Sequence, residues 1–150
     1  MFIAKVENGQ VGEIIDFRTY FGKTTSVTDE QLAAQGFVKV NLFREHNRLT
    51  QKLVSSTPVL ENGWVYTVAV ADLTAEEIQS AKDSAMAQIR GQRNSLLAAC
   101  DWTQIADSTA DKTAWATYRQ ALRDLPSTIT GDPRTFSDWP HDPNWVAMPI

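Results

Sequence analysis

The stretch DWTQIADSTADKTAWATYRQALRDLP, residues 101–126, holds the residue types that an acidic active site would need. A carboxyl group in an apolar cleft can act as a general acid or base. Asp101, Asp107 and Asp111 lie, however, at turns or near a helix start, where aspartate caps the backbone. Asp124 differs, because the helix dipole disfavours a carboxylate in a last turn. We expect it to pair with one of three cations: Arg93, Arg119 or Arg123.

Other chemical groups are sparse along the chain. Cys100, the one cysteine, ends an apolar run, which favours a buried small residue over a nucleophile. His141 has Asp138 and Asp142 near it, but no second histidine or cysteine completes a metal-ligand set. A glycine-rich phosphate loop is also missing from the sequence. The sequence therefore predicts a protein that is not an enzyme, with no catalytic, cofactor-binding or metal site.

Composition narrows the class of partner. The chain has 150 residues and a net charge of -4. Nucleic-acid binding needs clustered lysine and arginine, so we expect no nucleic-acid partner. The charge gives no attraction to an anionic membrane surface, and no run approaches the ~20 apolar residues of a transmembrane helix. A lone cysteine and the lack of a signal-peptide pattern favour folding in the cytosol.

The first half of the chain has the pattern of strands and tight turns. Asn8-Gly9 and Asn62-Gly63 each separate two β-rich runs, as in hairpins. Thr28, followed three residues later by Gln31, predicts the start of a short helix that Gly36 would close.

The second half changes to helical spacing. Thr74 and Glu77 form a capping-box pattern before an apolar stripe that extends to residue 98. A second stripe follows an S-x-x-D start at Ser108, and Pro126 is expected to stop it. The tail, with its prolines and with Trp139 and Trp145, predicts ordered extended backbone rather than a flexible linker.

These patterns predict an α+β fold with three parts. Residues 1–73 form a small, mainly antiparallel β lobe with one short helix. Residues 74–126 form an antiparallel helical hairpin, and residues 127–150 form an extended strap rich in proline and tryptophan. The last two parts together make one module, 74–150.

The order of residues in this module resembles a known family. The string IRGQRNSLLAACDWTQIADSTADKTAWATYRQALRDLPSTITGDPRTFSDWP is similar to the phage tail assembly chaperone family, over roughly residues 88–143. Many residue types and spacings in it match, although Asp132-Pro133 stands where members often have a Phe-Pro step. The first half is similar more loosely.

The resemblance implies a non-enzymatic chaperone that binds a tail-fibre or other tail or baseplate protein and assists its folding, trimerisation or attachment. Its oligomeric state would then follow a trimeric fibre. Its location would be the host-cell cytoplasm during phage assembly, with retention in the virion tail as an open possibility. The alternative is a structural subunit that stays on the fibre or baseplate as a cap or adaptor.

Aromatic and arginine side chains are the candidates for binding this partner, because such residues dominate interface energetics. The same aromatic residues are equally suited to the core of a helical hairpin. An exposed subset is expected among Trp102, Trp115, Tyr118, Arg119, Arg123, Trp139 and Pro140.

Overall fold

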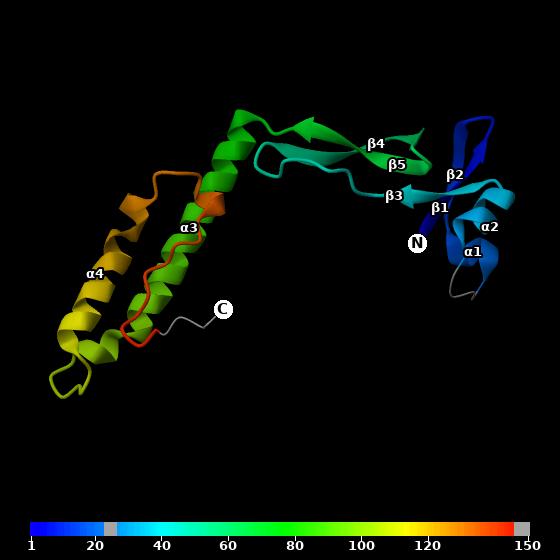
Figure 1. The fold of residues 1–150 in the computed structure, drawn as a ribbon. Helices are drawn as coiled ribbons and strands as arrows, with labels where there is room; N and C mark the ends of the chain where they lie inside the picture. Colours follow the sequence, from blue (N-terminus) through cyan, green and yellow to red (C-terminus); the bar gives the residue numbers. More distant parts are fainter. Residues whose placement is uncertain (23–26, 146–150) are drawn as a thin grey trace. The chain divides into compact units, whose positions relative to one another are not determined.

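A computed structural model describes residues 1–22 and 27–145 of the chain. The chain divides into two compact units, Met1–Leu73 and Thr74–Ile150. The fold is α+β, with a five-stranded sheet in the first unit and the long helices in the second (Figure 1). Residues 146–150, the end of the predicted strap, lie outside the described residues.

The sheet of the first unit is mostly antiparallel. Its strands are β1 (Phe2–Glu7), β2 (Gln10–Asp16), β3 (Phe37–Asn41), β4 (Gln51–Glu61) and β5 (Trp64–Asp72). Their order across the sheet is β2-β1-β3-β5-β4, and only the pairing of β3 with β5 is parallel.

Both predicted hairpin turns are present. Asn8 and Gly9 link β1 to β2 with φ angles of 52° and 77°, and Asn62 and Gly63 link β4 to β5 with 50° and 78°. Asparagine and glycine tolerate this left-handed region, which two-residue hairpin loops require.

Two short helices accompany the sheet, where the sequence predicted one. The predicted helix is α2 (Asp29–Ala34), and its capping box between Thr28 and Gln31 is confirmed. The additional helix, α1 (Phe17–Phe21), begins where the Asp16 carboxylate accepts a hydrogen bond from the Arg18 backbone N–H. At five residues, α1 is too short to give a periodic apolar pattern, so the prediction missed it.

The core of the first unit lies between these helices and one face of the sheet. Ile3 and Phe37 from the strands pack with Phe17 and Leu32 from the helices. Side chains alternate between the two faces of a strand, so Lys5 lies on the same face of β1 as Ile3. This face therefore changes from apolar at Ile3 to polar at Lys5.

Two long helices dominate the second unit. Helix α3 (Ala75–Ala99) begins with the predicted capping box, in which the Thr74 hydroxyl accepts from Glu77 N–H and the Glu77 carboxylate accepts from Thr74 N–H. A short 3-10 helix, η1 (Asp101–Gln104), follows, and α4 (Lys112–Thr128) runs back beside α3 (Figure 1).

Both ends of α4 differ from the prediction. The helix starts later than the Ser108 pattern indicated, because the carboxylate of Asp111 caps it by accepting from the N–H groups of Thr113 and Ala114. Pro126 does not stop the helix, which continues to Thr128. Pro126 has no N–H to donate to the carbonyl four residues earlier, so the helix loses one hydrogen bond there, while the hydroxyls of Ser127 and Thr128 donate to carbonyls of the last turn.

After α4, the chain returns along α3. A second 3-10 helix, η2 (Pro133–Thr135), contacts α3 (Figure 1). Asp132 caps η2 and also forms a two-pronged ion pair with Arg134, at distances of 2.6 to 3.2 Å between the carboxylate oxygens and the guanidinium nitrogens. This pair holds the pKa of Asp132 at about 2, well below its usual value.

Candidate partner-binding surface

Arg119 joins α4 to the end of α3. Its Nη1 donates to the Leu97 carbonyl at 2.8 Å and to Cys100 Sγ at 3.0 Å, and its Nη2 donates to Asp101 Oδ1 at 2.6 Å. Only 9% of the residue is exposed. The guanidinium thus satisfies a helix-end carbonyl and fixes the start of η1 relative to α4.

Burial and pairing act on Arg119 in opposite directions. Burial disfavours the charged guanidinium, but the hydrogen bonds from it to Asp101 and Cys100 outweigh this effect and raise the pKa of Arg119 above its ordinary value. The side chain is therefore a permanent cation held inside the unit.

Thr103 completes the connection and was not foreseen from the sequence. It is fully buried, and its hydroxyl donates to the Cys100 carbonyl at 2.7 Å. Threonine in a polar stretch gives no apolar signal, which is why periodicity alone missed it. Cys100 itself is buried, as its apolar neighbours predicted.

A row of aromatic rings runs from the interior toward the surface. The centroids of Trp115 and Tyr118 lie 5.8 Å apart with the rings nearly perpendicular, and those of Trp102 and Trp115 lie 6.1 Å apart. Trp115 and Tyr118 are buried with Cys100 and Leu122, and burial raises the pKa of the Tyr118 phenol.

The outer end of this row is exposed. Trp102 has 52% of its surface accessible, against 9% for Trp115, and Ile105 has 54% accessible. Both exposed residues lie in the connection between α3 and α4, where Arg119 and Thr103 hold the backbone. We call Trp102 and Ile105 the turn surface. Ile105 was missed by the sequence analysis, because it sits outside both helical stripes.

The other predicted residues lie in different surroundings. Arg123 is exposed on α4, whereas Trp139 and Pro140 are half-buried. Trp139 packs against the cluster around Leu122, and its ring lies 5.4 Å from that of Phe136. The exposed members of the predicted set are therefore Trp102 and Arg123, while Trp115, Tyr118 and Arg119 hold the interior; a role of any of them in binding stays a prediction.

In the part of the chain that the structure describes, Asp124 pairs with none of the three predicted cations, Arg93, Arg119 and Arg123. Its two carboxylate oxygens accept from Gln120 Nε2 at 2.9 and 3.0 Å, one helical turn earlier. Arg119 is engaged with Asp101 instead. The Gln120 amide is a donor one helical turn away, and its side chain is shorter than that of arginine, so less of it has to be ordered. Sequence spacing alone did not show which of these donors Asp124 would take.

His141 stacks on an indole ring. Its ring lies 3.8 Å from that of Trp145, with an angle of 12° between the planes. Within residues 1–22 and 27–145, no group of three or more histidine, cysteine or acidic side chains is placed to hold a metal ion. Over the same residues, no helix has the length and apolar character needed to cross a bilayer.

One comparison with known proteins finds a match, and the match lies within the second unit. Residues 86–144 match the model of a family described as phage tail assembly chaperone protein. No curated protein and no solved structure matches the chain. The matched segment contains the end of α3, the turn surface, all of α4 and the return along α3. Residues 86–144 are thus similar to the phage tail assembly chaperone family, and the resemblance inferred from the sequence is confirmed over this segment.

Proposed function

We propose that this protein is a non-enzymatic chaperone of a phage tail-fibre protein and that the turn surface docks the fibre chain. The observation that carries the proposal is the exposure of Trp102 and Ile105 on a connection that hydrogen bonds from Thr103 and Arg119 hold in place. Large apolar side chains on a fixed backbone bind a partner at low entropic cost.

The contacts of Arg119 and Trp115 next to Trp102 support this proposal. The ion pair of Arg119 with Asp101 lies directly beside Trp102 in the chain, and Trp115 lies behind its ring. Such support holds the exposed ring in one orientation, which is what an anchor in a partner's pocket requires.

Co-expression tests the chaperone role. A tail-fibre protein of the same phage is produced with and without this chain, and soluble trimer is measured by size-exclusion chromatography with light scattering. We expect the trimer to form in quantity only when this chain is present. Equal yields of soluble trimer under both conditions would rule the chaperone role out.

The alternative of a resident virion subunit makes a different prediction. A chaperone leaves after assembly, so mass spectrometry of purified virions should find none of this chain. Its presence at a fixed ratio to the fibre would instead support a structural cap or adaptor.

A further inference from the structure

The first unit contains a cavity that the family match does not cover. It measures about 530 Å3 and lies on the face of the sheet that α1 and α2 partly cover. Its size falls within the range of small-molecule and side-chain sites. Strand alternation explains its place: Ile3 is in the core beneath the helices, whereas Lys5 and Glu7, further along the same face of β1, line the cavity.

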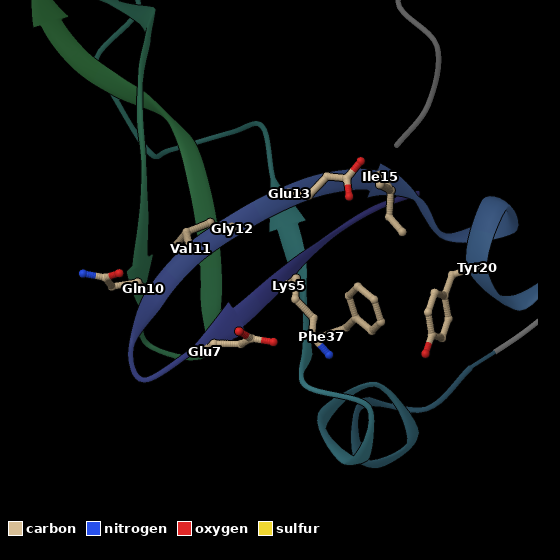
Figure 2. A pocket seen from close by; sticks show the side chains of 9 residues that line it. All are labelled: Lys5, Glu7, Gln10, Val11, Gly12, Glu13, Ile15, Tyr20 and Phe37. Atoms are coloured by element: carbon tan, nitrogen blue, oxygen red, sulfur yellow. The ribbon is translucent and has the colours of Figure 1, made fainter.

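One end of the cavity is an aromatic wall. The rings of Tyr20 and Phe37 meet edge to face, with centroids 4.7 Å apart, and Ile15 stands beside them (Figure 2). Tyr20 has 52% of its surface accessible, although it belongs to this ring pair. The exposed part of the Tyr20 ring is therefore accessible to a ligand in the cavity.

The chain's own cation already lies against this wall. Lys5 Nζ is 4.9 Å from the Phe37 ring centroid and donates to the Gln35 carbonyl at 2.7 Å. A Cβ at Gly36 would lie 3.2 Å from the Lys5 ammonium, so glycine leaves room for this contact without any shift. The Lys5 ammonium thus contacts Phe37 and the Gln35 carbonyl. Within the described part of the chain, it forms no ion pair with Glu7 or Glu13, the two acids that line the cavity.

Those acids are Glu7 on β1 and Glu13 on β2. Both are exposed and both line the cavity, Glu7 near the turn between β1 and β2 and Glu13 further along β2, near Ile15 (Figure 2). Among residues 1–22 and 27–145, neither has a cation within ion-pair distance. The cavity therefore combines two available carboxylates with an aromatic surface, which together favour a cation that carries a flat or apolar body.

We propose that this cavity binds an arginine side chain of a partner polypeptide. The guanidinium would pair with the carboxylate of Glu7 or of Glu13, and the rest of the side chain would lie against the aromatic wall of Tyr20 and Phe37. Arginine fits better than lysine, because its planar group both stacks on aromatic rings and forms two-pronged bonds to carboxylates. The site is independent of the turn surface and stands whether or not the partner is a fibre.

Nuclear magnetic resonance of the full-length, 15N-labelled protein tests the site. The probe is N-acetyl-arginine amide, and the matched control is N-acetyl-citrulline amide, which has nearly the same shape without the charge. We expect saturable shifts of the Gly12, Glu13 and Tyr20 amide signals with the arginine probe and at least threefold weaker binding of citrulline. N-acetyl-lysine amide should fall between the two.

Variants localise the binding. Glu7→Gln and Glu13→Gln should each weaken the arginine probe about two- to fivefold, as expected for a partly exposed charge pair. Tyr20→Leu should weaken it by a similar factor through loss of the aromatic face. Glu45→Gln, which removes an exposed acid that does not line the cavity, should leave binding unchanged.

Three results would overturn the proposal. The first is the lack of saturable shifts at the cavity, and the second is equal binding of arginine and citrulline probes. The third is occupation by something else: saturable shifts at the same amides with Mg2+ or Ca2+ alone, or with rising protein concentration, would assign the cavity to a metal ion or to a second copy. Each of these outcomes leaves the co-expression result untouched, so failure here and failure of the chaperone role are distinguishable.

Discussion

Trp102 and Trp115 show how far single residues can be interpreted from sequence. Both are tryptophans beside an apolar stripe, and both were candidates for core and for interface. The structure separates them, because α4 directs Trp115 into the cluster with Leu122, while η1 leaves Trp102 at the surface. Sequence spacing gives the face of a helix but not the direction of a side chain in a short turn.

Trp115→Ala should destabilise the second unit by about 3–5 kcal/mol, because it leaves a large cavity in the core. Trp102→Ala removes an exposed ring and should cost less than about 1 kcal/mol. Urea denaturation of both variants, followed by circular dichroism, measures the difference. Equal losses for the two variants would contradict the assignment of one ring to the interior and the other to the surface.

Arg119 remains a predicted partner-binding residue, and its burial and hydrogen bonds predict a structural task as well. Arg119→Ala removes charge-assisted hydrogen bonds and leaves the Leu97 carbonyl without this donor, so we expect a loss of about 1.5–3 kcal/mol in unfolding free energy. Arg123→Ala, an exposed neighbour on the same helix, is the control and should change stability by less than about 0.5 kcal/mol. A stable Arg119→Ala variant with weakened partner capture would contradict the structural task and support the partner-binding prediction.

The Asp132–Arg134 pair predicts a titration. Because the pKa of Asp132 in the folded state is lowered from 3.8 to about 2, the pair contributes stability above pH 3.8 that is lost as the pH falls toward 2. Carboxyl-detected nuclear magnetic resonance should give a midpoint near 2 for Asp132. Arg134→Gln should return the midpoint toward 3.8, and an unchanged midpoint in that variant would assign the shift to another cause.

Elements with explicit start and turn signals were the most predictable. The capping boxes at Thr28 and Thr74 and the Asn-Gly turns were found from sequence, because each relies on residues only one to three positions apart. Helix α1 was not found, because a five-residue element gives no apolar period. The end of α4 was not found either, because the hydroxyls of Ser127 and Thr128 bond to carbonyls of the last turn beyond the proline. The parallel pairing of β3 with β5 joins strands that are not consecutive, and local patterns carry no such information.

The capping box of α3 makes a prediction at this scale. Thr74→Ala removes the hydroxyl that accepts from Glu77 N–H and should destabilise the second unit by about 1 kcal/mol. Thr74→Ser keeps the acceptor and should stay close to the original protein. Ser80→Ala, on the exposed side of α3, controls for a general effect of alanine. Chemical denaturation of the three variants checks the order, and equal stability of Thr74→Ala and Thr74→Ser would contradict the capping role.

The whole molecule contains two units with separate cores. One core joins the sheet to α1 and α2, and the other joins α3, α4 and the chain that returns along α3. The family match lies within the second unit, so the proposed docking surface belongs to the matched region and the arginine site does not.

The central claim is that the turn surface holds the fibre. Capture of the fibre protein by tagged full-length chain, with bound fibre quantified at equilibrium, tests it with the double variant Trp102→Ser and Ile105→Ser. A buried tryptophan anchor is commonly worth 2 kcal/mol or more, so we predict at least tenfold weaker capture, with an unchanged circular dichroism spectrum. Leu42→Ser, which removes an exposed apolar side chain in the first unit, should capture as the original does. Undiminished capture by the folded double variant would contradict the claim.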